Sequence, residues 1–412
     1  MLPLDVFTAL WSIFTYVWWI VVPVVLFLIF KKLWLNYLFL YGIQKLEWVY
    51  LEIKVPKNIS RTPKAMEQVF SSVNAIWPKL TFLDKWWKGK VVEWFSFEMV
   101  GVSGGIYFFV RTPASLRNSI EAAIYAQYPE AEITQTEDYT ALLPEVLPNK
   151  SFDLFGTNFI LARENGYPIR TYEYFEDKED ERRLDPMAAI TEVMSKLKEG
   201  EMLCLQILVR PAGDDWKDEA EEMIKELIGE KKDKSAGFLE VLLDVLYSIL
   251  TAPFPSEPSE VRKSDAPKNQ LMFLTTGKKE VVEAVEAKTA KIGYKTNFRF
   301  VYIDNRDRFS RGNVSAVTGA LQQFNTKNLN AFKPDMDTMT SARWPMKGRK
   351  EYLRKVNIWR MYKWRAFADK SFVMNTEELA TLYHFPTLVV EAPGLRPLTA
   401  KKAEPPPNLP IG

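Results

Sequence analysis

The chain has 412 residues, and its 54 Lys and Arg nearly balance its 52 Asp and Glu, giving a net charge of +2. The net charge of the whole chain therefore indicates no class of partner, because attraction to a polyanion needs a large net positive charge or a local basic patch. The lone cysteine, Cys204, excludes an intrachain disulfide, and with the lone histidine, His384, it cannot build a His/Cys metal site. The length predicts two or more domains.

Residues 6–30 form an uncharged run of 25 residues, VFTALWSIFTYVWWIVVPVVLFLIF. A helix rises about 1.5 Å per residue and the hydrocarbon core is about 30 Å thick, so about 20 apolar residues suffice to cross it. A cleaved signal peptide would have a basic start, a shorter apolar core and a small-residue cleavage site, and this run has none of the three. We therefore expect an uncleaved transmembrane helix that is kinked at Pro23.

The charges that flank this run predict its orientation. Only Asp5 precedes it, whereas Lys31–Lys32 and Lys45 follow it, and basic residues near a span stay on the cytoplasmic side. We expect the amino terminus outside, the bulk of the chain in the cytoplasm and a single pass through the inner (cytoplasmic) membrane. Residues 33–43 continue the apolar character with interspersed aromatics and are expected to lie at the membrane interface, which completes an anchor over residues 1–45.

The order of the predicted elements after the anchor indicates an α+β fold with two ferredoxin-like domains. Residues 46–142 follow the order β-α-β-β-α-β, the split βαβ pattern. The strands are expected at 46–55, 92–100, 105–111 and 131–139, and the helices begin at Thr62-Pro63 and Thr112-Pro113. Threonine is a favourable helix cap and proline fits the first helical turn, so both dipeptides indicate helix starts.

Residues 150–305 repeat this pattern with a helical insertion over 214–254. Outside the insertion we expect a strand at 167–175, a helix from Asp185 to about Leu197, a strand at 202–211, a helix at 278–293 and a strand at 294–304. The insertion has a charged helix at 214–234 and an apolar helix at 238–254, followed by a proline-rich loop. The apolar helix could lie on the bilayer surface or pack on the sheet, and its acidic polar face favours packing, since surface-binding helices are usually basic.

Catalytic motifs are missing from the sequence or lie in the wrong context. There is no G-x-x-x-x-G-K-[ST] phosphate-binding loop, so Asp304, at the end of an apolar strand, is expected to be a buried strand end rather than a magnesium ligand. Residues 101–105 match the G-x-S-x-G nucleophile elbow, but two strands flank them, whereas the elbow joins a strand to a helix. Only His384 could act as the base. We predict no catalytic residue, no metal and no cofactor.

Basic and aromatic residues are concentrated at 341–370, within a predicted helical region over 306–370. This stretch holds ten Lys or Arg against two acids, with tryptophans and tyrosines interleaved. It could bind nucleic acid, whose phosphates and bases suit such side chains, or anionic lipid headgroups, or it could be a cationic amphipathic helix whose tryptophans pack on the domain. The candidate polyanion-binding residues are Arg349, Lys350, Arg354, Lys355, Arg360, Lys363 and Arg365.

Four phrases of the chain carry a resemblance to one class of proteins: QILVRP (206–211), KEVVEAVEAKTAKIGYKTNFRFVYI (279–303), ALQQFNTKNLNAFKP (320–334) and SFVMNTEELATLYHFP (371–386). With them the chain resembles the membrane-anchored, non-motor amino-terminal region of conjugative coupling proteins and type IV secretion-like ATPases of the FtsK–HerA class, which translocate DNA. In that class a similar segment and a proline-rich stretch lead into the motor domain. The corresponding segment here is 371–412, with its proline-rich stretch at 403–410, and the resemblance places the start of the motor at Gly412.

The resemblance and the missing phosphate-binding loop favour a non-enzymatic, membrane-anchored adaptor or scaffold of a type IV secretion-like or DNA-transfer machine. Such a protein would act with a separately encoded motor ATPase. One alternative is an enzyme, either a degenerate ATPase relative or an unrecognised hydrolase, and another is a membrane-tethered nucleic-acid-binding protein. A neighbouring reading frame that encodes the motor would favour the adaptor, whereas an exposed pocket with a shifted carboxylate pair would favour an enzyme.

Overall fold

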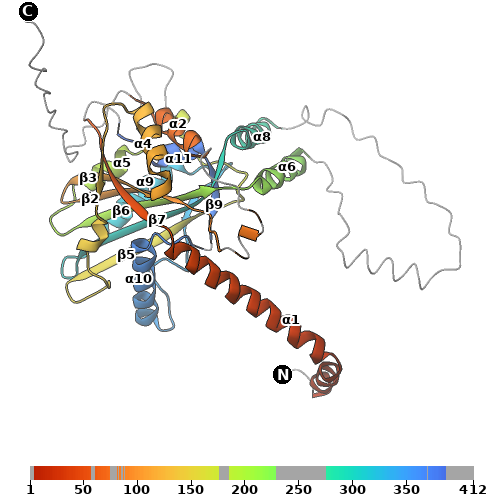
Figure 1. Ribbon diagram of the computed structural model, residues 1–412. Helices are drawn as coiled ribbons and strands as arrows, with labels where there is room; N and C mark the ends of the chain where they lie inside the picture. Colours follow the sequence, from red (N-terminus) through yellow and green to blue (C-terminus); the bar gives the residue numbers. More distant parts are fainter. Residues whose placement is uncertain are drawn as a thin grey trace, which may run out of the picture.

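The computed structural model describes residues 4–56, 61–74, 81, 83–84, 87, 89–175, 185–228, 275–368 and 370–386. The described residues form one nine-stranded sheet with helices on both faces (Figure 1). The strands are β1 Trp48–Lys54, β2 Phe95–Val102, β3 Gly105–Pro113, β4 Glu132–Thr136, β5 Phe152–Leu161, β6 Met202–Pro211, β7 Gly293–Asn305, β8 Phe332–Pro334 and β9 Phe372–Asn375. The helices are α1 Leu4–Gln44, α2 Pro63–Asn74, α4 Arg117–Gln127, α5 Ala188–Ser195, α6 Asp215–Ile228, α8 Thr276–Thr289, α9 Gly312–Leu321, α10 Lys347–Lys363 and α11 Thr376–Leu382.

The strand order of the sheet, β4-β1-β3-β2-β6-β7-β5-β8, contains one pattern twice. The first four strands of the chain lie in the order fourth, first, third, second. Strands β5 to β8 have the same order when the sheet is read from its other edge. The halves meet where β2 pairs with β6 in antiparallel register, with Met99 opposite Leu205. Strands from both expected domains therefore lie in one continuous sheet, and the expected mixture of helices with an antiparallel sheet is confirmed.

The elements expected over residues 46–142 are confirmed, with small shifts at their ends. The glycine-rich segment 101–105 is the turn of the β2–β3 hairpin, in which Ser103 has a φ of 49° and Gly104 a φ of 79°. Positive φ values of this kind occur in tight hairpin turns and are easiest for glycine. The turn conformation thus accounts for the glycines without any catalytic role for Ser103.

The second half of the sheet differs from the expectation at its first strand. The strand expected at 167–175 is wrong, because Tyr172–Tyr174 form a short 3₁₀ turn, and the strand of this half is β5, which pairs with β7. Pro168 lacks an N–H group to donate to a neighbouring strand, which disfavours a central strand there. The pattern also continues beyond residue 305, because α9 and β8 supply its last helix and strand from the region expected to be helical and basic.

The helical insertion is described only in part. Helix α6 lies within the charged helix expected at 214–234, and α8, which follows the insertion where a helix was expected at 278–293, packs against it through Ala220 and Val285. The apolar helix expected at 238–254 and the loop after it lie outside the described residues, as does the proline-rich stretch 403–410.

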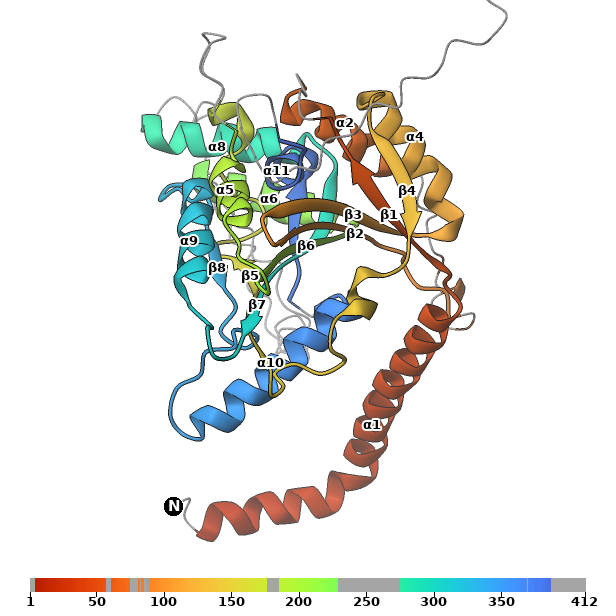
Figure 2. The ribbon, with the colours of Figure 1, turned by 90° about the vertical axis from the view of Figure 1, so that its left-hand side faces the viewer.

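The sheet is buried on both faces. Helices α2, α4, α5, α9 and α11 cover one face, where Phe70 of α2 lies 4.9 Å from Phe97 of β2 between ring centroids. Helix α10 covers the middle of the other face, where Ile358 and Trp359 belong to a smaller apolar cluster with Cys204 (Figure 2). Neighbouring residues of a central strand therefore point into two different cores.

The segment 371–386, which carries part of the resemblance, is built into this body. Strand β9 pairs with β7, and every residue of α11 is buried. Asn375 and Glu378 form a reciprocal capping box at the start of α11, and Glu378 also pairs with Lys288, whose Nζ lies 3.0 Å from its Oε2. Both side chains of this ion pair are fully buried, so the segment is a structural part of the sheet and its helical layer.

Helix α1 contains the whole predicted transmembrane span, residues 6–30, and continues as helix through residues 33–43, where an interfacial segment was expected. Among the described residues it is the one helix long and apolar enough to cross a membrane, and the stretch of it that qualifies is Val22–Gln44, which overlaps the end of the predicted span and includes the expected interfacial segment. It changes direction partway along (Figure 2), and Pro23 lies inside it, which is the usual cause of a sharp bend. Near its carboxyl end α1 packs on the body: Leu38 is buried, and Gly42 lies so close to Gly89 that a Cβ there would be 2.1 Å from the Gly89 carbonyl oxygen.

Candidate functional site

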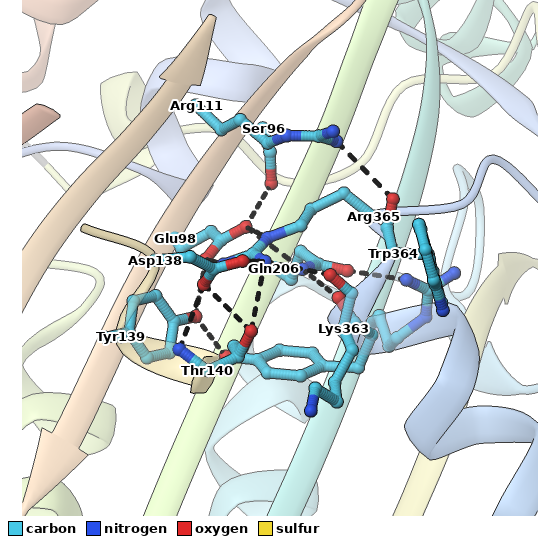
Figure 3. A network of polar contacts seen from close by, with 12 residues as sticks. Ser96, Glu98, Arg111, Asp138, Tyr139, Thr140, Gln206, Lys363, Trp364 and Arg365 are labelled. Atoms are coloured by element: carbon cyan, nitrogen blue, oxygen red, sulfur yellow. Dashed lines mark hydrogen bonds and ion pairs between the residues drawn. The ribbon is translucent and has the colours of Figure 1, made fainter. Parts of the chain in front are cut away.

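A row of buried polar side chains crosses the centre of the sheet on the face that α10 covers. It consists of Glu98 of β2, Gln206 of β6, Arg299 of β7 and Asn158 of β5, each directly opposite the next in the strand register. Gln206 Nε2 donates to Glu98 Oε1 at 3.0 Å (Figure 3). Arg299 Nε donates to Asn158 Oδ1 at 2.9 Å, and its Nη1 donates to Gln206 Oε1. The row is therefore continuously hydrogen-bonded across four strands.

This row holds the carboxyl end of α10. Arg299 Nη1 donates to the Met361 carbonyl and Nη2 to the Ala366 carbonyl, both at 2.8 Å. The last carbonyls of a helix, such as that of Met361, have no partner within the helix and carry partial negative charge, so a buried guanidinium is a favourable donor to them. The bond to Ala366 holds the segment that follows the helix. Burial lowers the pKa of Arg299 to about 9, which leaves the group protonated at neutral pH.

Arg365, two residues after the end of α10, locks the same region to the sheet. Its Nε lies 2.9 Å from Glu98 Oε1, and its Nη2 lies 2.9 Å from Asp138 Oδ1 (Figure 3). Burial raises the pKa of Glu98, but the charge and hydrogen bonds of Arg365 outweigh this effect and hold the pKa below its ordinary value. Arg365 also has a φ of 47°, an uncommon conformation that this network fixes. Arg365 is thus a structural residue, and its guanidinium is not exposed to a polyanion.

Arg111 of β3 lies beside this network without an acidic partner. It is 7% exposed, its guanidinium stacks 3.7 Å from the Trp48 ring centroid, and its Nη1 donates to the Trp364 carbonyl at 3.4 Å. Its Nε has no hydrogen-bond partner, and within the described part of the chain no carboxylate forms an ion pair with it. Burial lowers the pKa of Arg111 to about 10, so the side chain is still charged at neutral pH.

A pocket of about 600 Å³ opens next to Arg111, between the first strand and the carboxyl end of α10. The residues that line it include the aromatic Trp48, Tyr50 and Trp364 and the basic Arg111, Arg360 and Lys363. Asp138 also lines the pocket, but Arg365 and Thr140 bind its carboxylate, and the pKa of Asp138 is lowered because Arg365 outweighs the opposing effect of burial. A carboxyl group held ionised in this way is unsuited to act as a general acid.

The seven candidate polyanion-binding residues fall into distinct environments. Arg349, Lys350 and Arg360 are exposed, and Lys363 lines the pocket. The other three have structural partners, namely Met339 and Ser341 carbonyls for Arg354, Asp153 for Lys355, and Glu98 and Asp138 for Arg365. The structure therefore brings some of the candidates to one surface and places the rest within the body, while polyanion binding itself stays a prediction.

The amino-terminal end of α10 presents basic and apolar side chains together. Lys347, Arg349 and Lys350 are exposed, and Trp344, just before the helix, is 89% exposed. Met346, Tyr352 and Leu353 are also exposed. We call these residues the α10 tip. By contrast, Trp359 is buried and its Nε1 donates to the Pro144 carbonyl at 3.1 Å, so the expectation that tryptophans pack on the domain is met by Trp359 but not by Trp344 or Trp364.

The isolated residues that the sequence singled out have structural roles. His384 Nε2 lies 3.0 Å from Asp185 Oδ1 and its Nδ1 contacts the Ala380 carbonyl, so it is engaged away from the hairpin that holds Ser103. Asp304 is buried at the end of β7, as expected. Burial raises the pKa of Cys204 to about 12, which makes its thiol unreactive. In the described ranges no three His, Cys, Asp or Glu side chains gather in a way that could hold a metal ion.

Sequence reasoning missed Arg111, although its strand carried a usable signal. In β3, Ile106, Phe108 and Val110 point into the main core, so alternation places Arg111 on the opposite face with Tyr107. A charged residue on a strand face that also carries Tyr107 indicates a cation that needs a partner if that face is buried.

The family model described as "Domain of unknown function (DUF8128)" matches residues 40–395, which include the sheet, the polar row, the pocket and α10. The chain belongs to this family. A search of curated proteins finds no match to the chain.

Proposed function

We propose that the chain is a membrane-anchored adaptor that holds its sheet at the cytoplasmic side of the inner membrane, with the α10 face toward the bilayer. The observation that carries this proposal is that α1 and α10 extend from the same face of the sheet (Figures 1 and 2). The layer formed by α2, α4, α5, α9 and α11 covers the other face. An anchor in α1 would therefore bring α10 to the lipid surface and leave the helical layer free for a partner.

The surface of α1 supports the anchor. Phe27, Phe30 and Leu33 are all exposed on it, as are most of its apolar side chains that the structure describes. A long helix with uncovered apolar residues is not stable in water and is suited to a hydrocarbon environment. Lys31–Lys32 and Lys45 follow the first apolar run and support a cytoplasmic location for the body.

The α10 tip supports contact with an anionic leaflet rather than with nucleic acid. Lys347, Arg349 and Lys350 supply exposed positive charge, and each basic residue near such a surface contributes about 1 kcal/mol of attraction. Trp344 and Leu353 are exposed beside them, and amphipathic rings and apolar side chains insert favourably at the headgroup level. Because α1 holds the body next to lipid in this proposal, anionic headgroups are closer to the α10 tip than nucleic acid is.

We also propose that the two halves of the sheet are two ferredoxin-like units joined through β2 and β6. Each half has the order fourth, first, third, second, and a helix connects its first strand to its second and its third strand to its fourth. The second unit then runs from β5 to β8, and the insertion lies between its second and third strands. A sheet continuous across both units would make a stiff platform.

The partner in this proposal is a separately encoded motor ATPase of a type IV secretion-like or DNA-transfer machine. Its support is the set of phrases that resemble the non-motor region of coupling proteins. The test is affinity isolation of the tagged full chain from detergent-solubilised membranes of its own source, with an unrelated tagged single-pass protein as the control. We expect enrichment of an ATPase that has a phosphate-binding loop.

A variant of the chain tests whether the ATPase binds away from the α10 tip. Replacing Lys347, Arg349 and Lys350 with glutamine should leave the ATPase bound, because these residues face the bilayer in our proposal. Recovery of no ATPase above the control, or loss of the ATPase in this variant, would contradict the proposal.

A further inference from the structure

We propose that the pocket beside Arg111 is a binding site for an anionic phosphate ester. Four observations point to it: a buried cation without an acidic partner, a cavity of suitable size, further cations on the same wall, and flat aromatic surfaces around them. This inference is independent of the adaptor role and of any motor partner.

Arg111 is the buried cation of this site. Removing a charged group from water costs several kcal/mol unless an opposite charge or a full set of hydrogen bonds compensates it. Arg111 has the ring of Trp48 on one side and one long hydrogen bond to the Trp364 carbonyl, while its Nε has no partner. Glu98 and Asp138 both form ion pairs with the neighbouring Arg365, so neither carboxylate forms one with Arg111. The fold therefore keeps a guanidinium whose charge and donors are only partly compensated.

The pocket supplies the space for the missing anion. Arg111 lines a cavity of about 600 Å³, which is within the range of about 300–1,000 Å³ usual for small-molecule sites. A guanidinium presents its N–H groups as a planar fork that matches a phosphate or carboxylate. The Nε of Arg111 is buried and has no partner, and no ion pair holds the guanidinium, so an anion bound in the pocket that Arg111 lines can compensate its charge without displacing an internal acidic partner.

Two further cations favour a phosphate over a carboxylate. Arg360 and Lys363 lie on successive turns at the end of α10 and line the same pocket as Arg111. Three cations suit a phosphate monoester, which carries more negative charge and more acceptor oxygens than a carboxylate. Glu145 also lies on the wall and is exposed. The site therefore keeps a positive balance even when this carboxylate is counted.

The aromatic residues that line the pocket indicate that the phosphate is attached to an apolar or flat organic group. Trp48, Tyr50 and Trp364 line the pocket, and Trp364 is 72% exposed at its rim. Such rings cover apolar or flat groups and keep water from the ion pair beneath them. Because Trp48 follows α1 by only a few residues, the headgroup of a phospholipid can reach this site, and so can a soluble phosphate ester.

The test uses the full chain in nanodiscs and two probes that separate these sources. Glycerol 3-phosphate, titrated by calorimetry against chain in phosphatidylcholine nanodiscs, reports on soluble esters. Phosphatidic acid, added to the same nanodiscs and followed by native mass spectrometry, reports on a lipid headgroup. We expect saturable binding of one equivalent in at least one arm, and the responding arm identifies the source. No saturable binding in either arm would overturn the proposal.

Variants assign the binding to the pocket. Arg111→Gln should weaken it by roughly tenfold to a hundredfold, because hydrogen bonds from a charged group are among the strongest, and Lys363→Gln should weaken it less. Lys278→Gln removes one positive charge from an exposed position on α8, outside both the pocket and the α10 tip, and should leave the affinity unchanged. Equal affinity in the wild type, Arg111→Gln and Lys363→Gln, or an equal loss in Lys278→Gln, would contradict the assignment.

Stability separates a ligand-binding role of Arg111 from a structural one. Without ligand, Arg111→Gln should keep or raise the thermal midpoint, because it removes a poorly compensated buried charge. With ligand, the wild type should gain thermal stability and the variant should not. If Arg111→Gln fails to fold, the proposal still requires Lys363→Gln, at a partly exposed position, to lower the affinity, and an unchanged affinity there overturns it.

Discussion

Glu98 of β2 and Arg365 form an ion pair in which both side chains are buried, with Arg365 Nε 2.9 Å from Glu98 Oε1. The pair joins the centre of the sheet to the segment that follows α10, across more than 250 residues of sequence. Its geometry keeps the carboxyl end of α10 and the pocket beside Arg111 in place.

The first prediction concerns the stability that depends on this pair. Glu98→Gln should lower the free energy of unfolding by about 3–5 kcal/mol, because it leaves the Arg365 charge buried with less compensation. Glu192→Gln is the matched control, since Glu192 pairs with Lys196 on the surface at 2.6 Å. Exposed pairs contribute about 0–1 kcal/mol, so the control should unfold almost like the wild type in urea. Equal losses in the two variants would refute a special role for the buried pair.

The second prediction is the pH dependence of the same pair. The pKa values of Glu98 and Asp138 are both lower in the folded state than their ordinary values of about 4, because Arg365 outweighs the effect of burial. Their contribution is therefore complete above about pH 4 and is lost as the pH falls through the folded-state pKa values. The urea concentration at the midpoint of unfolding, measured at successively lower pH, should fall less steeply for Glu98→Gln than for the wild type. Parallel curves would show that these carboxyl groups do not control acid unfolding.

A third prediction separates two tryptophans near the end of α10. Trp359 is 1% exposed and Trp364 is 72% exposed. Trp359→Ala should cost about 3–5 kcal/mol, as truncation of a buried aromatic usually does. Trp364→Ala should change stability by less than about 1 kcal/mol, because it removes little buried surface. Thermal or urea unfolding of the two variants tests this, and a larger loss for Trp364→Ala would contradict the described packing.

The fourth prediction concerns the α10 tip. Replacing Lys347, Arg349 and Lys350 with glutamine should abolish the preference of the chain for anionic lipid, with a thermal midpoint close to that of the wild type, since exposed substitutions rarely exceed about 0.5 kcal/mol. Arg354 and Lys355 are kept, because both have structural partners. Co-flotation with phosphatidylcholine vesicles, with and without phosphatidylglycerol, measures the preference.

Single-stranded DNA provides the contrasting outcome for that experiment. If the wild type binds DNA tightly at physiological salt and ignores anionic vesicles, the nucleic-acid interpretation of residues 341–370 replaces the lipid interpretation. In that case binding should fall with salt at a slope near roughly −0.7 per phosphate contact.

The sequence was most informative where each element has one strong pattern. The length of the uncharged run predicted the anchor. The glycines predicted the hairpin turn at 101–105, and the alternation of apolar residues predicted the strands on either side of it. Strand β5 was missed because Asp153 and Gly156 interrupt its apolar pattern, and its burial depends on the pairing with β7 rather than on local preference.

The candidate site shows a similar limit. A count of basic residues identified α10 but could not distinguish exposed Lys350 from buried Arg365, because ion pairs between residues far apart in sequence decide burial. Arg111, which the count did not include, became significant only when its missing acidic partner and the pocket were seen together.

The most direct test of the central proposal measures the distance of the two faces of the body from lipid. Cys204 is buried and its raised pKa leaves it unreactive, so a single added cysteine can carry a fluorophore without background. Lys350→Cys places the label at the α10 tip, and Ser315→Cys places it on α9 in the opposite layer, and both positions are exposed. In nanodiscs that contain brominated lipid, we expect strong quenching of the label at 350 and little quenching at 315. Equal quenching at the two sites, or stronger quenching at 315, would contradict a membrane-facing α10.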